Sequence, residues 1–420
     1  MYKLMRKLAV NFIQFVKWVV VSGVIGIVVG LVGTAFFYGM KAATNLRQAN
    51  PYIIWGLPVA GLFIVGLYQL AHKENDRGTN TVLAAVRSEG QLTFSVAPLI
   101  FVSTLLTHLF GGSAGREGAA LQMGGSIGNW FGKLLHMNKT DVHVMVMCGM
   151  SACFSALFGT PMAAAIFSME VVSVGVMYYA ALVPCAFASL VALGVAQYFG
   201  VPSEAMVIEQ IPEFNVLSGG KVVVVAALLA GVSMLFCVVL HGVSTCGKKW
   251  LPNPYLRIVV MGLLVVVLHM ATGTEDYMGA GMEVIERCMH GEVNAEAFLL
   301  KMLLTALTLG AGYKGGEIVP SFYVGATCGC VLGGVLGLSP SLCAAVGMIA
   351  VFCGVTNCPI TSLLIALELF GMEAFPFFLL GIAVSYMLSG YYSLYEEQRI
   401  LYSKYKAEYR EYGQKNRETQ

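Results

Sequence analysis

Charged residues are scarce in this sequence. Asp, Glu, Lys and Arg make up only 11% of its 420 residues, whereas a soluble domain contains about 25%. This scarcity excludes an ordinary soluble globular protein. The formal net charge is +2 at pH 7, so the chain lacks both the basic excess that favours nucleic acid and a strongly acidic character. We therefore expect no nucleic-acid partner.

Cysteine and histidine spacings typical of metal sites are also lacking. The eleven cysteines are scattered, and many of them, such as Cys237, Cys328 and Cys343, lie inside apolar segments. Cysteines in such segments usually act as small apolar packing residues in a reduced environment. The seven histidines show no ligand spacing either. The sequence therefore predicts no metal and no cofactor.

Apolar residues, in contrast, are abundant. Hydrophobic residues make up 57% of the chain, and the mean hydropathy is +0.75. Segments such as 18–40, 222–243 and 318–390 reach or exceed the roughly 20 apolar residues that a membrane-spanning helix needs. Residues 223–240 are apolar almost throughout, whereas the strands of a membrane barrel alternate polar and apolar residues. The predicted fold class is an all-α polytopic membrane protein.

The charges outside the apolar segments predict how the chain is oriented. Residues 201–220 contain three glutamates and no lysine or arginine, whereas 245–257 contain three basic residues and no acidic one. Because basic loops stay in the cytoplasm, the first segment is predicted outside and the second inside. Residues 1–17 are basic and are predicted to be a cytoplasmic N-terminal segment. Residues 396–420 are polar and mixed in charge, which predicts a short solvated cytoplasmic helix or tail without a regulatory domain.

An internal repeat divides the membrane region into two halves. Four anchor residues of the first half recur at a constant offset of 198 residues: Gly149, Phe154, Pro161 and Glu170 match Gly347, Phe352, Pro359 and Glu368. Related halves are typical of secondary transporters, whose ion site lies between the halves and is built from broken helices. We expect a first membrane repeat over 18–220 and a second over 221–395. The repeat alone leaves open whether the halves are parallel or inverted.

Glu117 is the first candidate functional residue. It follows a glycine-rich stretch at 111–115 and has apolar segments on both sides. A carboxylate at membrane depth costs about 2.5–3.5 kcal/mol on insertion scales and is by default a functional hypothesis. A helix beginning near Ala119 would aim its free N–H groups at this turn and form an anion site. Glu117 can fill that site with its own carboxylate and leave it when protonated; alternatively, it caps its own helix or pairs with Arg116.

The second half repeats this arrangement at 313–320. Pro320 suits the first turn of a helix, and Gly315 and Gly316 permit a tight entry into it. Two helix N-termini, one from each repeat, would then converge on one anion. Glu317 is either a second proton-handling group or a first-turn acid that complements the helix dipole, and both interpretations stay open.

A third glycine-led element lies at Gly78–Asn80. Thr79 and Asn80 supply side-chain donors and are natural helix N-caps. Taken alone, the element is a helix cap. Its interest comes from the two glycine-rich elements that follow it.

Together these elements resemble the CLC family of chloride channels and anion/proton antiporters. The resemblance runs from Gly78 to Tyr395, with residues 115–118 matching the family's gating-glutamate motif and 316–320 its glycine-to-proline motif. Residues 390–395 resemble the late motif whose tyrosine hydroxyl donates to the anion. The resemblance implies two inverted repeats of broken helices and a homodimer with one pore per subunit.

The resemblance also assigns roles to individual residues. Glu117 would be the gate and proton carrier, and Glu317 would assist protons. The implied anion-binding groups are the side chains of Thr79, Asn80 and Tyr395, with Tyr392 as an alternative register, and the backbone amides near Gly118, Ile318 and Val319.

Departures from the usual motifs concern the substrate. Chloride-selective members begin with Gly-Ser-Gly-Ile-Pro, whereas this chain has Thr79 in place of the serine and lacks the proline. Where proton-coupled chloride members carry a second internal glutamate, this chain has Val171, which places the usual inner proton path in doubt. These features, with Glu317, resemble the bacterial fluoride/proton antiporter branch. A small, strongly hydrated anion needs dense donors, which Thr79 and Asn80 would add.

The sequence therefore predicts a multi-pass protein of the bacterial inner membrane that exchanges fluoride for protons and exports fluoride. Its partners would be fluoride or chloride, protons, the lipid bilayer and a second copy of the chain. The alternative is a chloride/proton antiporter or passive chloride channel of the same family. A serine hydrolase is not expected, although Ser113 stands in a Gly-x-Ser-x-Gly pattern near His108, because that motif needs an α/β fold around it. Converging intramembrane carboxylates argue against a membrane scaffold without transport activity.

Overall fold

The computed structural model describes residues 2–87, 92–406 and 408–412, which form sixteen α-helices and three short strands. The helices of the first half are α1 (Tyr2–Ala49), α2 (Leu57–Leu70), α3 (Thr79–Val86), α4 (Val96–Leu109), α5 (Glu117–Leu134), α6 (Lys139–Phe158), α7 (Pro161–Glu170) and α8 (Leu182–Tyr198). Those of the second half are α9 (Val216–Trp250), α10 (Pro254–Thr272), α11 (Met282–Met289), α12 (Ala297–Ala311), α13 (Ile318–Leu336), α14 (Pro340–Thr356), α15 (Pro359–Phe370) and α16 (Phe375–Leu388).

Seven helical stretches among the described residues are long and apolar enough to cross a membrane, and five shorter helices are also apolar. The all-α polytopic fold is therefore confirmed. The apolar run at 318–390 is not one element, because three residues with positive φ interrupt it: Gly337 at 61°, Asn357 at 58° and Gly371 at 78°. Hydropathy does not register these breaks, since the backbone turns without leaving apolar surroundings.

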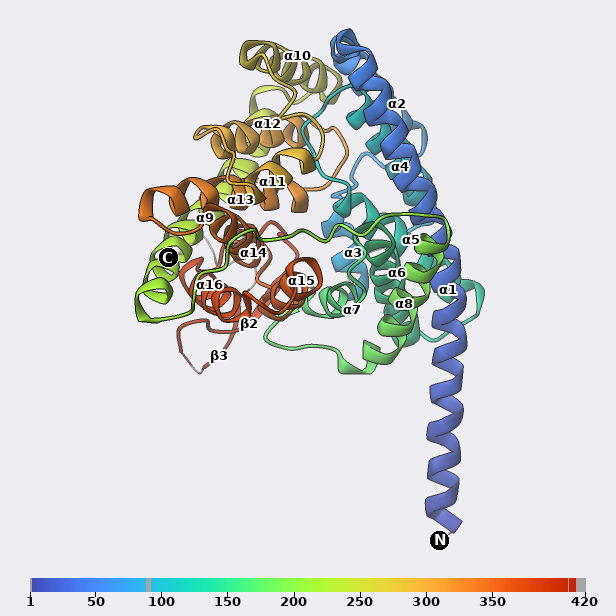
Figure 1. Cartoon of the computed structure of the whole chain (residues 1–420). Helices are drawn as coiled ribbons and strands as arrows, with labels where there is room; N and C mark the ends of the chain where they lie inside the picture. The colour runs from blue at the N-terminus through green and yellow to red at the C-terminus, as the bar shows by residue number, and fades with distance from the viewer. Residues whose placement is uncertain (1, 88–91, 407, 413–420) are drawn as a thin grey trace.

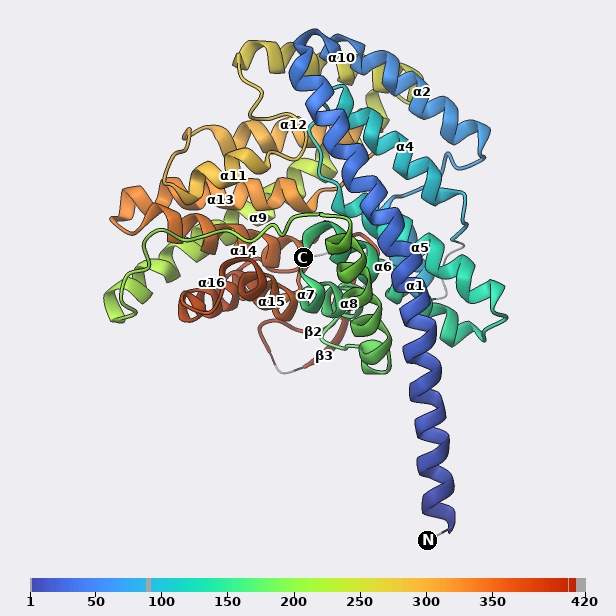
Figure 2. The ribbon, with the colours of Figure 1, turned by 45° about the vertical axis from the view of Figure 1, so that its right-hand side comes forward.

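Helix α1 is longer than the span predicted at 18–40. It runs unbroken from Tyr2 to Ala49, and its N-terminal part extends beyond the other helices in two views (Figure 1, Figure 2). The sequence contains no proline or glycine before Gly23 that would end the helix earlier. The boundary expected after residue 17 is therefore not a break in secondary structure.

The two halves contact each other reciprocally through α7 and α15. Glu170, the last residue of α7, accepts hydrogen bonds from two N–H groups at the start of α15, at 3.1 and 2.8 Å. Glu368, near the end of α15, accepts from two N–H groups at the start of α7, at 2.8 and 2.9 Å. Contacts of this reciprocal form indicate a two-fold axis, here between repeats. The two equivalent helices run antiparallel, so the repeats are inverted.

Glycines let neighbouring helices approach at backbone distance. A Cβ added at Gly124 of α5 would overlap the carbonyl oxygen of Gly149 of α6, and one added at Gly149 would overlap that of Gly124. The same relation links Gly325 of α13 with Gly347 of α14. These matched crossings explain part of the high glycine content. They also fix how α5 and α13, whose first turns form the site, sit within each half.

Replacing Gly124→Ala is therefore expected to prevent normal folding. The added methyl group has no space against backbone, and overpacking of even a flexible core costs about 1–3 kcal/mol. Gly231→Ala on α9 is the matched control, because an added Cβ there meets nothing within 4 Å. The yield of monodisperse protein and the melting temperature in detergent are measured for both variants. Equal yield and melting temperature for the two variants would contradict the close crossing.

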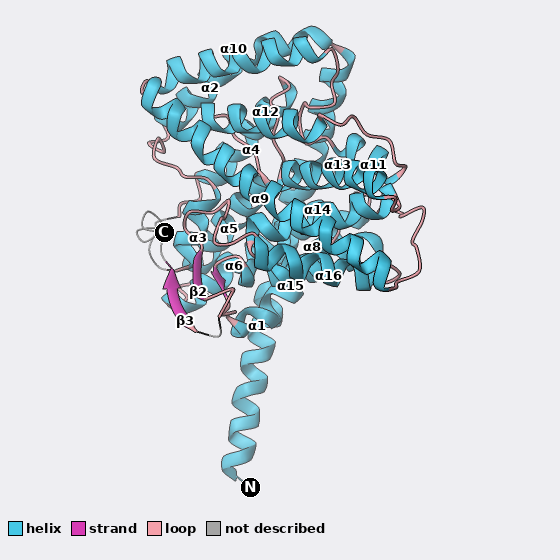
Figure 3. Cartoon of the chain, turned by 90° about the vertical axis from the view of Figure 1, so that its left-hand side faces the viewer, coloured by secondary structure: helices cyan, strands magenta, loops and turns pink. Residues whose placement is uncertain are grey.

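The C-terminal segment differs from the helix or tail predicted over 396–420. Its described part forms β2 (Arg399–Tyr402), which pairs parallel with β1 (Ser173–Val174) and antiparallel with β3 (Tyr409–Tyr412), as Figure 3 shows. Strand β1 follows directly after α7 and offers a free edge, and Ile400 is fully buried on β2. Charge composition alone does not predict these strands, because the strand that pairs with β2 lies far away in the sequence.

Candidate functional site

The two glycine-rich turns meet at the centre of the molecule. Gly115 and Gly316 form an antiparallel bridge in which the N–H of each donates to the carbonyl oxygen of the other, at 2.6 and 2.8 Å. This bridge brings the first turns of α5 and α13 side by side. The first N–H groups of both helices lack intrahelical partners, as in any helix, and here they lie next to each other. The predicted convergence of two helix N-termini is thus present in the fold.

Glu117 is the first residue of α5 and is fully buried. Its Oε2 accepts a hydrogen bond from the N–H of Arg116 at 3.0 Å, and its Oε1 lies 3.4 Å from Nε of Arg116 without a well-formed hydrogen bond. Contacts expected for a helix cap and for an Arg116 pair are therefore both present. Arg116 is not reserved for Glu117, however, because its Nη2 also pairs with Glu204. The gate candidate thus has a shared cation as its neighbour.

Two other predicted residues, Thr79 and Glu317, lie next to Gly118. A Cβ built on Gly118 would lie 3.3 Å from Oγ1 of Thr79 and 3.4 Å from Oε2 of Glu317. Thr79 and Gly118 are buried, and Glu317 is partly exposed. Glu317 stands at the N-cap position of α13 without capping it through its side chain. The structure therefore gathers a hydroxyl, a carboxyl and free backbone amides around one glycine.

The remaining backbone donors are those of the first turn of α13. Ile318 and Val319 are its first two residues and are both buried. Pro320 follows them inside the first turn. Its ring and its missing N–H make proline well suited to this position. The predicted amide groups thus sit at the start of a helix, next to Gly118.

Tyr395 reaches the same region from the end of the chain. It is fully buried, and its hydroxyl has no hydrogen-bond partner among the described residues. The ring lies within electrostatic range of both Glu317 and Glu117. Tyr392, the alternative register, is 47% exposed. A buried hydroxyl without a partner is costly, so the hydroxyl of Tyr395 has a donor to offer, and its contact with an anion stays a prediction.

Asn80 has a different contact from the one predicted. Its Oδ1 accepts a hydrogen bond from the N–H of Glu397 at 3.1 Å, which ties the start of α3 to the Tyr395 segment. The N-cap of α3 is Gly78, at φ 65°, rather than Thr79 or Asn80. Thr81 instead accepts from the N–H of Arg77 at 3.0 Å. Thr79 is thereby the first helical residue, and its hydroxyl is directed toward Gly118.

Residues that hold Tyr395 in place were missed by the sequence reasoning. Gln398 is buried and donates to the carbonyl oxygens of Val171 and Thr356, at 3.1 and 2.6 Å. Its Oε1 accepts from Asn357 and Ser393, at 3.1 and 2.8 Å. Every hydrogen-bonding position of this amide is used. No motif marks Gln398, and its place in a polar segment after the last apolar run concealed its burial.

The hydrolase pattern around Ser113 does not form a catalytic pair. The hydroxyl of Ser113 lies 3.0 Å from that of Thr305, while Nε2 of His108 lies 3.3 Å from the carbonyl oxygen of Gly115. Ser113 therefore hydrogen-bonds α12 and not the histidine. Among the described residues, no group of three His, Cys, Asp or Glu side chains is placed to hold a metal ion.

Glu170 and Glu368, the matched glutamates of the repeat, act as helix caps. Replacing Glu368→Ala leaves two N–H groups of α7 without their carboxylate and is expected to cost about 1.5–3 kcal/mol of stability. Proton-coupled transport by the folded fraction should remain. Glu373→Ala, at an exposed position just after α15, is the control. A melting temperature equal to that of Glu373→Ala, or lost coupling in folded Glu368→Ala, would contradict a purely structural cap.

Comparison with known proteins places this geometry in a family. Residues 60–390 match the family model described as voltage gated chloride channel. The chain is 35% identical to a chloride/fluoride channel protein of Pseudomonas syringae pv. tomato, over 93% of this chain and 88% of that protein.

Solved structures agree with this result. A CLC-type fluoride/proton antiporter superposes with a TM-score of 0.89 at 31% identity, over 93% of this chain and 99% of that one. A slow cyanobacterial Cl−/H+ antiporter, at 18% identity and a TM-score of 0.76, covers 89% of this chain and 94% of that one and shares the fold. The family model and the relatives both span most of the membrane region. This multi-span membrane protein therefore belongs to the voltage-gated chloride channel, or CLC, family, a family of channels and transporters rather than enzymes.

Proposed function

We propose that this protein exports fluoride from bacteria by exchanging it for protons across the inner membrane. The observation that carries the proposal is the position of Glu117: a buried carboxyl at the first turn of α5, directly before Gly118, which lies beside the hydroxyl of Thr79, and in electrostatic interaction with Tyr395. A carboxyl that shares the anion's donors competes with the anion when charged and yields to it when protonated. Proton binding and anion binding are thereby linked at one place.

Glu117 alternates between two states in this mechanism. As a carboxylate it is stabilised by the N–H of Arg116 and by the positive end of the α5 dipole, and it excludes the anion. Protonation from outside removes its charge, and the neutral side chain moves away. The anion then binds the free amides and hydroxyls and leaves past Arg116. Release of the proton toward the cytoplasm restores the carboxylate.

Donor density supports fluoride as the anion. Dehydrating a small anion is expensive, and only short, charge-assisted hydrogen bonds offset that cost. The amides at the starts of α5 and α13, the hydroxyl of Thr79 and the unpartnered hydroxyl of Tyr395 are all within the same region. Two proteins more than 30% identical to this chain are named for fluoride, one as a chloride/fluoride channel and one as a fluoride/proton antiporter.

Glu317 is the second proton-handling group of the proposal. Its Oε2 faces Gly118, and the side chain interacts electrostatically with Glu117. Glu170 is unsuited to this role, because its carboxylate is hydrogen-bonded to the start of α15 and to the hydroxyl of Thr361. A proton leaving Glu117 therefore passes to Glu317 and onward to the cytoplasm. The functional unit is a homodimer with one such pathway in each subunit.

Flux from liposomes tests the proposal. Purified protein is reconstituted, the vesicles are loaded with fluoride or chloride, and anion efflux and internal pH are followed together. We expect fluoride efflux accompanied by proton uptake, and much slower chloride efflux. Chloride efflux equal to or faster than fluoride efflux would overturn the choice of anion. Fluoride efflux without proton uptake would make the protein a channel.

A further inference from the structure

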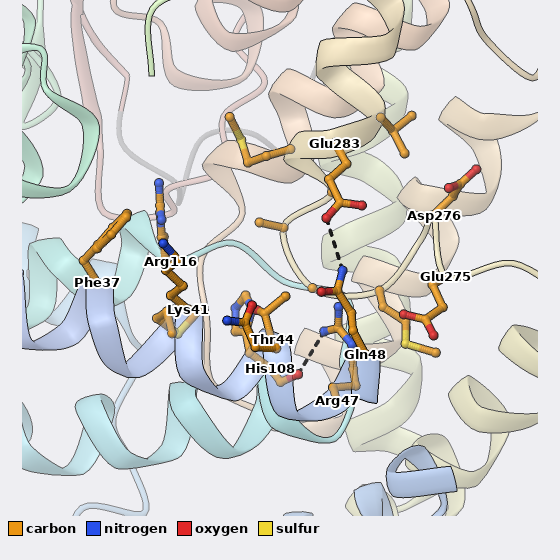
Figure 4. A pocket seen from close by; sticks show the side chains of 18 of the residues that line it. Phe37, Lys41, Thr44, Arg47, Gln48, His108, Arg116, Glu275, Asp276 and Glu283 are labelled. Atoms are coloured by element: carbon orange, nitrogen blue, oxygen red, sulfur yellow. Dashed lines mark hydrogen bonds between the residues drawn. The ribbon is translucent and has the colours of Figure 1, made fainter. Parts of the chain in front are cut away.

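A cavity of about 320 Å³ lies directly beyond Arg116 from the gate. Its walls come from the C-terminal part of α1, the residue before α5, and the loop that leads into α11. Figure 4 shows Arg116 toward one end, Glu275 and Asp276 toward the other, and Arg47 and His108 between them. Glu204, from the segment predicted to lie outside, also lines it. The cavity is thus the outward continuation of the site at Glu117.

Buried cations surround the middle of this cavity. Arg47, Arg116 and Lys301 all act electrostatically on His108. Arg47 is 6% exposed and Lys301 is fully buried. Burying a cation is expensive unless a negative charge or several hydrogen bonds compensate it. Arg47 and Lys301 are two such groups near one side chain, and Arg116, which is 12% exposed and paired with Glu204, lies in the same region.

Arg47 is the cation whose bonding is least complete. Its Nη1 donates to the carbonyl oxygen of His108 at 3.0 Å, while its buried Nε finds no hydrogen-bond partner among the residues that the structure describes. No carboxylate lies within ion-pair distance of Arg47 in the described part of the chain; Glu275 and Glu283 act on it only at longer range. The guanidinium, although it is itself buried, therefore keeps donor capacity at the cavity.

Lys301 contributes charge without filling the cavity. Its ammonium donates to the carbonyl oxygens of Tyr277 and Gly279, at 3.1 and 2.7 Å, and lies over the ring of Tyr323. Gly279 lines the cavity and is itself hydrogen-bonded to the backbone of Gly112. Lys301 and Gly279 thus connect the cavity wall to the loop at Gly112 that leads to the gate. Its positive charge stands behind that wall.

The acidic groups of the cavity are mostly engaged elsewhere or near the opposite end. Glu204 pairs with Arg116, Asp276 pairs with Arg287, and Glu283 accepts a hydrogen bond from Gln48 at 3.2 Å. Glu275 remains near the end opposite Arg116 (Figure 4). Among the described residues, Arg47 is therefore the buried cation of this lining that has no paired carboxylate, and the part of the cavity beside it is the electropositive part.

We infer that this cavity is a second anion site, at which the transported halide binds between Arg47, His108 and Arg116 outside the Glu117 gate. Arg47 is its main ligand, through the guanidinium donors that the protein leaves unused. An anion held there neutralises part of the buried positive field. Its identity as fluoride rests on the proposed function, whereas the site itself rests on the cavity and its cations. The site receives the anion after the gate and delays its return.

Placing a fixed negative charge in the cavity tests this inference. Thr44 lines the cavity on α1, three residues before Arg47, and is half-buried. Thr44→Asp introduces a carboxylate that occupies the positive field, and Thr44→Asn, of nearly the same shape, is the neutral control. Sodium fluoride and sodium chloride are titrated calorimetrically into the purified full-length protein. We expect Thr44→Asp to bind one halide per subunit fewer than wild type, and Thr44→Asn to match wild type.

A transport measurement and a second substitution complete the test. For fluoride added on the outer side of vesicles, the half-saturating concentration should rise about tenfold in Thr44→Asp, the loss of one charge-assisted contact. Arg47→Gln should give the same two changes, and Arg47→Lys should reverse them in part. Equal halide counts for Thr44→Asp and Thr44→Asn overturn the second site. Calorimetry measures halide binding and not transport. Failure of the second site is therefore distinguishable from failure of the proposed function, which would show as a wild-type protein that does not exchange fluoride for protons.

Discussion

Replacing Glu117→Gln is expected to abolish proton movement while anion movement continues. Glutamine keeps the length and shape of the side chain but carries no ionisable proton. The anion donors around Gly118 are backbone amides and hydroxyls, which the substitution does not touch. Fluoride efflux from reconstituted vesicles should therefore proceed without internal pH change. The variant would behave as a fluoride conductor.

The size of this effect follows from the burial of the carboxyl. Glu117 is fully buried, and an intramembrane charge costs about 2.5–3.5 kcal/mol on insertion scales. That cost makes the carboxylate a strong competitor for the donors nearby, so its charge decides whether the anion enters. A permanently neutral residue removes this competition. Proton flux should fall to the background of empty vesicles.

Two comparisons keep this prediction specific. Glu317→Gln should slow proton movement but leave the gate titratable, so some coupled exchange should persist. Glu213→Gln, at an exposed position before α9, should resemble wild type. Coupled exchange that persists in Glu117→Gln, with pH change per fluoride as in wild type, would show that another group carries the proton.

The central part of the site could be predicted from the sequence because its motifs are local. Glu117, Gly118 and Ile318 each follow within three residues the glycine that shapes their turn, Gly115 or Gly316, so the local sequence specifies which amides become free. Thr79 was identified for its hydroxyl, although Gly78 and not Thr79 caps its helix. The repeat, visible as matched anchors, appears in the fold as reciprocal caps between α7 and α15.

Features that depend on distant pairing could not be predicted. Asn80 bonds the backbone of Glu397, Gln398 bonds Thr356, and β2 pairs with β1, all across long sequence separations. The pattern of a single sequence does not indicate which distant residues form hydrogen bonds with each other. Buried cations follow the same rule: Lys301 stands in an apolar helix with no motif around it, and its ligands are carbonyl oxygens of a loop. Only the fold shows that it stands behind the wall of the outer cavity, bonded to Gly279 of that wall.

Replacing Gly316→Ala is expected to reduce anion transport at least tenfold in protein that still folds. A Cβ at this position would lie 2.5 Å from the backbone nitrogen of Gly118 and 3.1 Å from that of Glu117. The methyl group would therefore cover the amides that the anion needs and push the first turns of α5 and α13 apart. A tenfold loss corresponds to an increase of about 1.4 kcal/mol in the transport barrier. Removal of one hydrogen-bond donor to an anion typically costs more than this.

Gly334→Ala, on the same helix, separates this effect from a general loss of helix packing. An added Cβ at Gly334 meets nothing within 4 Å, so that variant should transport fluoride as wild type does. Calorimetric fluoride binding distinguishes a blocked site from a slow gate, since Gly316→Ala should lose affinity and not only rate. Wild-type affinity in folded Gly316→Ala would mean that the anion does not use the amides beside Gly118. Because Gly115 and Gly316 hold the two repeats together by reciprocal hydrogen bonds at this point, the anion site and the repeat interface depend on the same missing side chain.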